Sequence, residues 1–299
     1  MELIRDAAAL RRRMDDLRAG GGTVALVPTM GDLHGGHRSL ISRARREHPV
    51  VSVSIFVNPR QFGDAADFEA YPRDESRDLA ACEELGVDVV WAPHVDEVFP
   101  PGLELPSPDP GPAGGTYEGA ARPGHFEGVL TVVHRLFDVF GPCAAYFGEK
   151  DAQQLFLVQR MVDLERLPVE VVACPTVRES DGLAMSSRNA RLSPDEREQA
   201  GCLFLALSEA AELARSGERD TNVLVAAMAR EVGATPLARL DYAAVIDDRT
   251  FTPAARLEPE MPARALVAAR FPSARLIDNL RLSARDRVGD DGRWLRPEP

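Results

Sequence analysis

The first half of this sequence alternates short apolar runs with segments of helical pattern, and this alternation restricts the fold more than any other feature. The runs are rich in β-branched residues and bounded by turn residues, as strands are; they lie at Val24–Pro28, Val50–Val57, Asp88–Trp91, Ala144–Phe147 and Val169–Ala173. Helical patterns separate them near Ser39–Glu47, Glu75–Leu85, Val129–Phe140 and Asp151–Leu164. We therefore predict an α/β domain with a parallel sheet, helices on both faces, and ligands bound beyond the carboxyl ends of the strands.

The pattern changes after Arg188. Ser193–Glu196 combines a capping box with proline at the first helical position, which predicts the start of a long helix. A second helix is expected near Thr221–Val232, and strands are expected at Leu240–Ile246, Ala265–Phe271 and Leu276–Leu282. Helices followed by consecutive strands predict a smaller α+β domain with an antiparallel sheet. We therefore expect two domains, residues 1–188 and 189–299.

Composition indicates a cytoplasmic protein without a membrane anchor. The chain is 44% hydrophobic and 27% charged, as globular proteins usually are, and no stretch approaches the roughly 18 apolar residues that a membrane-spanning helix needs. Met1–Gly20 carries arginines in place of an apolar secretory segment, so we expect it to form a surface helix. The four cysteines are far apart and form no C-x-x-C pair, which favours free thiols over disulfides or a zinc site.

The net charge limits the partners. A formal charge of −12 argues against a nucleic-acid partner, because duplex binding requires a basic face. A protein this acidic must bind an anion with local donors. Lysine and arginine together number 35, yet Lys150 is the only lysine. Either a coding bias favours arginine, or a compact ammonium with three donors is needed at this position; its neighbours favour the second explanation.

A segment rich in proline and glycine interrupts the alternation. Of the 25 residues in Pro100–Gly124, 13 are proline or glycine, which predicts an irregular loop, and loops of this length are often lids or disordered. Arg122 and His125, near its end, would let a lid bring charge to a ligand. A solvated linker explains the composition equally well.

The turn after the first predicted strand, Pro28–His37, is the first candidate site. The common nucleotide and hydrolase motifs G-x-x-x-x-G-K-[ST], G-x-G-x-x-G and G-x-S-x-G are absent from the sequence. Here glycines allow a close backbone approach, and a helix that begins near Gly35 would direct unpaired N–H groups at a phosphate. His34 and His37 share one face of such a helix and could donate hydrogen bonds to phosphate oxygens. A zinc pair, which needs a third ligand, and two structural histidines are the alternatives.

The second and third turns carry polar side chains after further predicted strands. Phe56–Gly63 supplies the amides of Asn58 and Gln61, which suit a small hydroxy acid, although Asn-Pro also marks an ordinary turn. Phe147–Gln154 contains Lys150, which could bridge phosphate oxygens, beside Asp151, which could bind a ribose hydroxyl or orient the lysine. A surface turn is the alternative there.

The fourth turn, Met185–Arg188, places two serine hydroxyls beside an arginine and could form a compact anion clamp. Serines before a helix are also common caps. Taken together, the four turns are much more specific than any one of them. They describe a pocket for a nucleoside triphosphate with an adjoining polar site.

The four turns resemble the ordered motifs of the pantothenate synthetase (pantoate–β-alanine ligase, AMP-forming) family; the matching segments are Pro28–His37, Phe56–Gly63, Phe147–Gln154 and Met185–Asn189. The similarity runs from about Thr23 to Asn189 and continues more loosely through Leu276–Asn279. It implies an enzyme of coenzyme A biosynthesis that joins pantoate to β-alanine through a pantoyl adenylate and releases AMP and pyrophosphate. It also implies a Rossmann-like N-terminal domain, a C-terminal lid domain and a homodimer.

The resemblance further implies roles for individual residues. The catalytic set would be His37, His34, Lys150, Ser186, Ser187 and Arg188. ATP would enter with Mg²⁺ and without a fixed protein metal site, bound by Met30, Gly31, Asp32, Leu33, His34, Gly35, Gly36, His37, Gly148, Glu149, Lys150, Asp151, Val177, Met185, Ser186, Ser187 and Arg188. Pantoate and β-alanine would be bound by Gln61, Gln154, Asn58 and Arg122.

Three positions depart from the family pattern. Asp32 and Gly35 stand where alanine and glutamate are usual, and Ala152 stands where tyrosine is usual; these changes put the local loop geometry in doubt more than the reaction. Two other functions are weighed: a nucleotidyltransferase acting on a phosphorylated substrate, and a nucleotide-binding regulatory protein without catalysis. The neutral Gln61 and Gln154 argue against the first. The intact histidines, lysine and serine–arginine clamp argue against the second.

Overall fold

The computed structural model describes residues 1–63 and 68–282. Its internal contacts divide the chain into two compact units, one of Met1–Val177 and one that begins at Arg178, whereas the sequence analysis placed the division after residue 188. Residues 178–188 group with the second unit, where Arg178 forms a bidentate ion pair with Asp278. Residues 283–299, which we assigned to the C-terminal domain, lie outside the described residues.

The first unit is built on a parallel sheet of six strands in the order β1-β4-β3-β2-β5-β6. The strands are β1 (Glu2–Ile4), β2 (Val24–Thr29), β3 (Val50–Ile55), β4 (Val89–Trp91), β5 (Cys143–Gly148) and β6 (Val169–Cys174). The five predicted strands and their parallel arrangement are confirmed. The strand β1 was not predicted; it lies within Met1–Gly20, where we expected only a helix.

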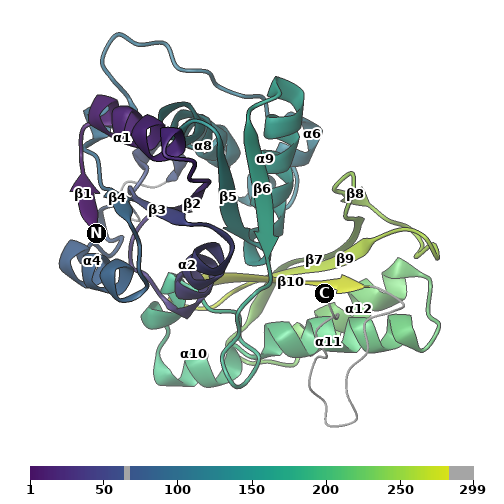
Figure 1. The fold of residues 1–299 in the computed structure, drawn as a ribbon. Helices are drawn as coiled ribbons and strands as arrows, with labels where there is room; N and C mark the ends of the chain where they lie inside the picture. The colour runs from purple at the N-terminus through teal and green to yellow at the C-terminus, as the bar shows by residue number, and fades with distance from the viewer. Residues whose placement is uncertain (64–67, 283–299) are drawn as a thin grey trace. The chain divides into compact units, whose positions relative to one another are not determined.

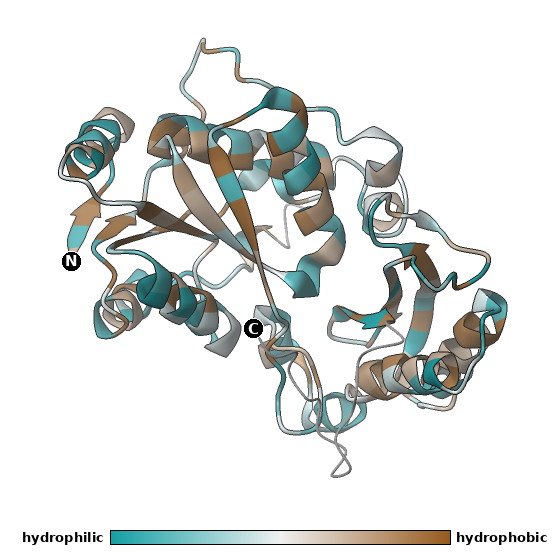
Figure 2. Cartoon of the chain, turned by 45° about the vertical axis from the view of Figure 1, so that its right-hand side comes forward, coloured by the Kyte–Doolittle hydropathy of each residue, from teal (hydrophilic) through white to brown (hydrophobic). Residues whose placement is uncertain are grey.

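Helices cover both faces of this sheet, as expected (Figure 1). One core joins the sheet to α1 (Ala7–Ala19), α8 (His125–Phe140) and α9 (Ala152–Glu165), and a second core joins it to α2 (Gly35–Glu47) and α4 (Glu75–Glu84). Figure 2 shows largely hydrophobic strands between these two helical layers. Strands that are buried on both faces have nearly continuous apolar runs, which explains why the sequence showed them so clearly.

The helix α1 lies within Met1–Gly20 and confirms the surface helix that we expected there, with one buried stripe. Leu10 and Met14, which are one helical turn apart, are fully buried in the first core. Arginines occupy many of the other positions of this helix. It is therefore an amphipathic helix whose narrow apolar stripe is easily overlooked among the charged residues.

The segment Pro100–Gly124 is not irregular throughout. After α5 (Val95–Val98), its second half contains two short helices, α6 (Gly111–Gly114) and α7 (Glu118–Ala121), and Gly119 is buried. A Cβ atom on Gly119 would lie 1.6 Å from the carbonyl oxygen of Gly114, so glycine permits the two helices to pack closely. The expectation of an irregular loop is therefore wrong for residues 111–114 and 118–121.

The second unit is built on an antiparallel sheet of four strands in the order β10-β9-β7-β8. The strands are β7 (Arg239–Asp247), β8 (Thr252–Pro253), β9 (Ala263–Arg270) and β10 (Arg275–Leu282). The helices α11 (Cys202–Arg215) and α12 (Thr221–Gly233) share one core with this sheet. The α+β class, the antiparallel sheet and three of its strands are thus confirmed, while the two-residue β8 was not predicted.

The capping box at Ser193 is formed as expected. Its hydroxyl accepts a hydrogen bond from the N–H of Glu196 (3.3 Å), and the Glu196 carboxylate accepts one from the N–H of Ser193 (2.7 Å). The long helix predicted from this cap is instead two helices, α10 (Pro194–Gln199) and α11, separated at Ala200 and Gly201. Glycine is a poor helix former, so Gly201 explains why the predicted helix is interrupted at this position.

Candidate functional site

The turn after β2 is fixed by a carboxylate from α4. Asp78 is 2% exposed, and its oxygens accept hydrogen bonds from the backbone N–H groups of Asp32 (2.9 Å) and Leu33 (2.8 Å). Burial raises the pKa of this carboxyl group, although the two backbone hydrogen bonds oppose the shift. A Cβ atom on Gly31 would lie 2.8 Å from Asp78 Oδ2. Gly31 and Asp78 together therefore set the path of the chain into α2.

Asp32 adopts a left-handed backbone conformation in this turn, with a φ of 52°, directly after Gly31 with a φ of 81°. Aspartate enters this region more readily than most residues with a side chain, because its short polar group can hydrogen-bond locally. The departure from the family pattern at Asp32 therefore has a local structural explanation.

His34 and His37 close the first turn of α2. Nδ1 of His34 accepts a hydrogen bond from the N–H of Gly36 (3.1 Å), and Nδ1 of His37 accepts one from the N–H of His34 (3.4 Å). An accepting imidazole nitrogen carries no proton, so both neutral rings hold their proton on Nε2. The structural role that we weighed for this pair is therefore present, and it leaves each Nε2–H group as a donor.

Both imidazoles are neutral at pH 7. Burial, together with the neighbouring His34, lowers the pKa of His37 to about 3. Burial, followed by the positive charge of Lys150, lowers the pKa of His34. Neutral rings that are already held in place can donate hydrogen bonds to charge that develops on an oxygen, with little reorganisation.

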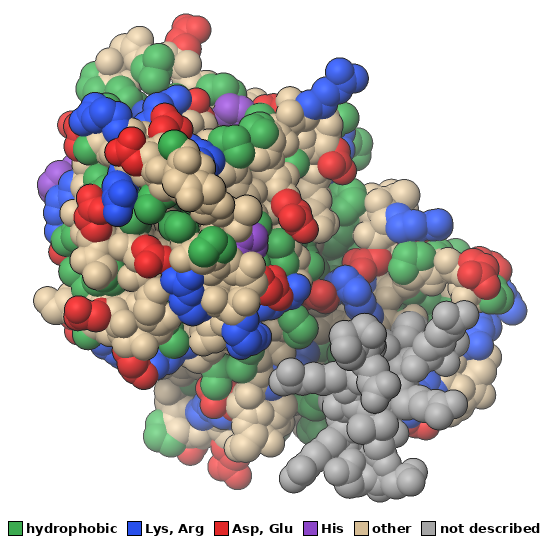
Figure 3. Space-filling view, in the orientation of Figure 1, with side chains coloured by type: hydrophobic (Ala, Val, Ile, Leu, Met, Phe, Trp, Pro, Cys, Tyr) green, Lys and Arg blue, Asp and Glu red, His purple; other side chains and the backbone are tan. Residues whose placement is uncertain are grey.

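Lys150 follows β5 in the 3₁₀ turn η2 (Glu149–Asp151). Because β5 pairs in parallel with β2, the lysine turn and the histidine turn leave the sheet at the same edge. The Lys150 ammonium lies 3.4 Å from a carboxylate oxygen of Asp151, and its charge contributes to the lowered pKa of both histidines. On the face seen in Figure 3, basic and acidic side chains are interspersed, so local groups such as Lys150 must supply positive charge for an anion.

Asn58 fixes the second turn, which contains the 3₁₀ turn η1 (Pro59–Gln61), against α8. Its amide donates to Gln61 Oε1 (3.0 Å) and to the carbonyl of Gly128 (3.1 Å), and its Oδ1 accepts from the N–H of Arg60. A Cβ atom on Gly128 would lie 2.2 Å from the carbonyl oxygen of Arg60, so glycine is needed at this contact. Both donors of Asn58 are thus engaged with the protein, so this side chain orients Gln61 and keeps only a lone pair of Oδ1 for a ligand.

Gln61 connects the first two turns. Its Nε2 lies 2.8 Å from Met30 Sδ, and its backbone carbonyl accepts a hydrogen bond from Nδ1 of His125 (2.9 Å). Nε2 of His125 in turn accepts from the guanidinium of Arg122 (3.0 Å). Burial, followed by the positive charge of Arg122, lowers the pKa of His125 to about 4. A neutral His125 leaves Arg122 as the charged member of the pair that we expected to bring charge to a ligand.

Two adjacent glutamines at the start of α9 have different surroundings. Gln153 is 4% exposed; its amide accepts from the N–H of Glu118 (3.0 Å) and donates to the carbonyls of Ala113 (2.6 Å) and Thr116 (2.9 Å). It therefore fixes the segment that contains α6 and α7. Within residues 1–63 and 68–282, the half-buried Gln154 amide has no hydrogen-bond partner, so it remains available to a ligand.

The serine-rich turn belongs to the second unit. Ser186 Oγ accepts a hydrogen bond from the N–H of Arg188 (3.3 Å) and caps the 3₁₀ turn η3 (Ser187–Arg191). The capping role that we weighed for these serines is therefore present at Ser186. Residues 185–189 are all partly exposed. None of these residues is therefore fully buried.

Two residues that shape the site, Asp78 and Gln153, were not predicted from the sequence. Asp78 lies on the buried face of α4 with Ala81 and Cys82, and a carboxylate on an apolar face needs a polar partner. Gln153 lies one helical turn before the buried Leu157. In both cases a polar residue stands among the apolar residues of a helix face, and this pattern could have indicated a buried polar contact.

The structure thus brings the histidine, amide and lysine turns to the carboxyl edge of one parallel sheet, where α/β sheets bind their ligands. Across the described part of the chain, no three His, Cys, Asp or Glu side chains group closely enough to hold a metal ion. Nor does any described helix have the length and apolar character needed to cross a membrane.

A family model for pantoate-beta-alanine ligase matches residues 2–281. The chain belongs to the pantoate–β-alanine ligase family. A pantothenate synthetase from Roseiflexus castenholzii is 51% identical over 263 residues, which cover 88% of this chain and 94% of the relative. A pantothenate synthetase from Thermus thermophilus is 51% identical over 257 residues, which cover 86% of this chain and 92% of the relative.

Solved structures of the family agree with this fold. The crystal structure of pantothenate synthetase from Thermus thermophilus has a TM-score of 0.87 at 46% identity and covers 95% of this chain and 100% of that chain. The crystal structure of pantoate–β-alanine ligase from Francisella tularensis is a complex with β-γ ATP and β-alanine. It has a TM-score of 0.74 at 32% identity and covers 94% of this chain and 97% of that chain. The chain is therefore an enzyme, a pantoate–β-alanine ligase, and the family resemblance seen in the four turns is confirmed.

Proposed function

We propose that this ligase condenses pantoate with β-alanine through a pantoyl adenylate and releases AMP and pyrophosphate. The observation that carries this proposal is the convergence of neutral His34, neutral His37 and Lys150 at the carboxyl edge of β2 and β5. This set can stabilise negative charge on a phosphoryl group but contains no obvious base. The first half-reaction requires that combination.

Pantoate is a carboxylate at neutral pH, so its attack on the α-phosphorus of ATP needs no general base. A carboxylate oxygen forms a bond to phosphorus, and the bond to the pyrophosphate oxygen breaks. The difficulty lies in holding two anions together and in stabilising the phosphoryl oxygens. The Lys150 ammonium and the Nε2–H groups of His34 and His37 are the donors that we assign to this task. Ser186, Ser187 and Arg188 are proposed to add further contacts to ATP.

Mg²⁺ is proposed to enter as part of the ATP substrate. No cluster of carboxylate and imidazole groups among the described residues is suited to hold a divalent ion by itself. Magnesium commonly binds through substrate phosphates with only one or two protein carboxylates. When bound, it would screen charge on the departing pyrophosphate.

Pantoate is proposed to bind through neutral amides. Gln154 offers an amide without a partner in the described structure, and Gln61 is oriented by Asn58 and lies beside Met30. Amides can hydrogen-bond both the hydroxyl groups and the carboxylate of a small hydroxy acid. Arg122, held beside the Gln61 carbonyl, is proposed to attract the substrate carboxylates.

In the second half-reaction, the neutral amine of β-alanine attacks the carbonyl carbon of the pantoyl adenylate. A carbon–nitrogen bond forms, AMP leaves with the electrons of the carbon–oxygen bond, and the amine loses a proton. The mixed anhydride would hydrolyse in water, so the site must exclude solvent while it exists.

Turnover of ATP with pantoate, in the presence and absence of β-alanine, tests this proposal. AMP, pyrophosphate and the amide are followed by mass spectrometry. Equal amounts of AMP and pantothenate, with pyrophosphate release that already requires pantoate, are expected. A product that retains the nucleotide would instead indicate a nucleotidyltransferase, and ATP binding without any product would contradict the proposed reaction.

A further inference from the structure

Residues 178–189 form a hairpin-like loop that carries Ser186–Arg188. The loop is closed by a bridge between Arg178 and Ala184 and by a hydrogen bond from the N–H of Glu179 to the carbonyl of Leu183 (2.8 Å). It contains no long strand or helix of its own before η3. Its conformation must therefore come mainly from side chains that attach it to the rest of the second unit.

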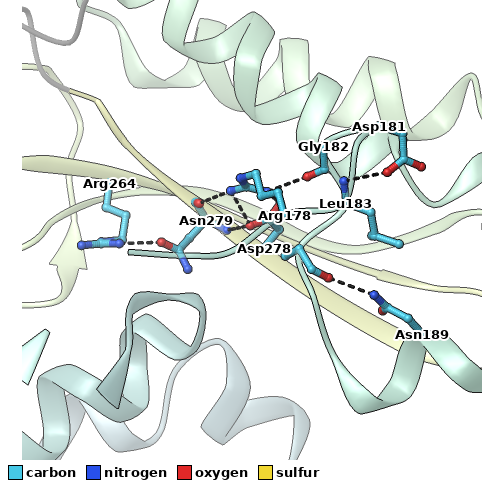
Figure 4. A network of polar contacts seen from close by, with 9 residues as sticks. Arg178, Asp181, Gly182, Leu183, Asn189, Arg264, Asp278 and Asn279 are labelled. Atoms are coloured by element: carbon cyan, nitrogen blue, oxygen red, sulfur yellow. Dashed lines mark hydrogen bonds and ion pairs between the residues drawn. The ribbon is translucent and has the colours of Figure 1, made fainter. Parts of the chain in front are cut away.

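The main attachment is an ion pair between Arg178 and Asp278 in β10 (Figure 4). The guanidinium donates to both carboxylate oxygens, at 2.6 and 3.0 Å, and the Asp278 side chain is only 1% exposed. The same guanidinium donates to the carbonyls of Gly182 (2.9 Å) and Asn279 (3.3 Å). A planar guanidinium held by this many acceptors has a single orientation, which a lysine could not reproduce.

Packing reinforces this orientation. The Arg178 guanidinium carbon lies 4.4 Å from the centre of the Phe204 ring in α11. A Cβ atom on Gly182 would lie 2.1 Å from the same ring, so the tip of the loop rests directly on Phe204. Phe204 therefore contacts both ends of the Arg178–Gly182 hydrogen bond.

A neighbouring pair holds Asp278 in place. Asn279 donates its N–H to the Asp278 carboxylate (2.7 Å), and its side chain accepts from Arg264 (2.5 Å). Arg264 is itself buried and bound by both oxygens of Asp248, at 2.7 and 2.9 Å. Figure 4 shows this chain of contacts running from Arg264 through Asn279 to Arg178.

The serine–arginine turn, residues 185–188, is held by contacts within the same loop. Asn189 donates to the carbonyl of Ala184 (3.0 Å), so the turn is closed onto the strand-like part of the loop. Asp181 accepts from Arg197 in α10 at 2.5 and 3.2 Å and also caps the N–H of Leu183. Because this second pair is about one-third exposed, it constrains the loop less than the buried pair does.

We propose that Asp278 is a positioning residue for the ligase reaction: through Arg178, it sets the conformation of residues 178–189 and hence of Ser186–Arg188. A buried ion pair is a weak source of stability, because the desolvation of both charges offsets their attraction. Its bidentate geometry does determine orientation. This inference rests on the proposed contact between Ser186–Arg188 and ATP.

Amide hydrogen exchange tests the structural part without any turnover. In full-length Asp278→Asn, exchange in residues 179–189 should rise relative to the wild type. Asp241→Asn is the matched control, because it makes the same change in the same sheet, at a carboxylate paired with Arg275. Arg178→Lys serves if Asp278→Asn does not fold, since it keeps the charge but cannot bind both oxygens and Gly182. Unchanged exchange in 179–189 would overturn the proposal.

Pyrophosphate release with ATP and pantoate tests the functional part. Asp278→Asn should lower kcat/KM for ATP by about tenfold to a hundredfold, because small misplacements of binding groups have effects of this size. Asp241→Asn should stay within about twofold of the wild type.

A double-variant cycle then distinguishes positioning from general destabilisation. If Asp278 acts through Arg188, adding Asp278→Asn to Arg188→Ala should cause little further loss of kcat/KM. Losses that multiply would overturn the proposal. A wild type that releases no pyrophosphate would count against the proposed function alone, because the exchange experiment does not depend on activity.

Discussion

Nδ1 of His37 accepts the backbone N–H of His34 at 3.4 Å, and the centroids of the two rings lie 4.1 Å apart. Each ring therefore uses one nitrogen for the helix cap and keeps the other as a donor. Asparagine places an acceptor where Nδ1 lies but has nothing at the position of Nε2. Substitution by asparagine can thus separate the capping role from the catalytic role.

His34→Asn should retain stability and lose activity. Asparagine is among the best N-cap residues, so the free energy of unfolding should not fall, whereas His34→Ala should lose about 0.5–2 kcal/mol. Both variants lack the Nε2–H donor and should release pyrophosphate about 10²–10³-fold more slowly. Urea denaturation and a pyrophosphate assay measure the two effects. Wild-type rates in His34→Asn would show that this ring is only a cap.

His37 should contribute a pH-dependent term to stability. Its pKa is about 3 in the folded protein and 6.5 in its ordinary state, so between these values the unfolded chain binds more protons. The free energy of unfolding should therefore fall as the pH drops from about 6.5 towards 3. This component should be absent from His37→Asn and retained in His94→Asn, a change at an exposed histidine. Equal pH dependence in all three proteins would contradict a neutral, buried His37.

Lys150 should be essential for adenylation. Lys150→Ala should keep the fold, because the change leaves the buried apolar face of α9 intact. It should lower the rate of pyrophosphate release by about 10²–10³-fold or more. Lys150→Arg should also be poor if the compact ammonium is required. Full activity of the arginine variant would show that the single lysine reflects coding bias.

The fold could be predicted largely because its central strands are buried on both faces. Val24–Thr29 and Cys143–Gly148 gave continuous apolar runs, and the helices between the strands had clear patterns. The prediction of an irregular loop failed at residues 111–114 and 118–121, because glycine occurs both in loops and at close contacts between helices. Glycine is common in loops, but Gly119 is needed because α6 and α7 touch, and no local pattern distinguishes these cases.

The site could be predicted where its residues act from their own turns. His34, His37 and Lys150 all follow strands in segments with distinctive glycine or charge content. The residues that hold those turns could not be found in the same way, because their partners are distant in sequence. Asp78 binds a turn 45 residues earlier, and Gln153 binds an N–H 35 residues earlier. Only the packing of the sheet and its helices brings such pairs together.

Asp78→Asn should loosen the histidine turn. An amide has one accepting oxygen, and its NH₂ group would face a backbone N–H of Asp32 or Leu33. We expect a loss of about 1–3 kcal/mol in the free energy of unfolding and a fall of about tenfold to a hundredfold in kcat/KM for ATP. Asp88→Asn is a matched control, because Asp88 also accepts a backbone N–H, that of Val51, at the start of β4. If both variants lose the same activity, Asp78 has no special role at the site.

Gln153 and Gln154 offer the sharpest test of which side chains face the substrate. Gln154→Ala should raise KM for pantoate by about tenfold, as expected for a lost hydrogen bond to a charged ligand, and leave the urea midpoint unchanged. Gln153→Ala should remove three hydrogen bonds to backbone groups of residues 113–118, at about 0.5–1.5 kcal/mol for each. It should therefore make residues 111–121 more sensitive to limited proteolysis. The opposite pattern, with Gln153→Ala stable and weak in pantoate binding, would reverse the two assignments.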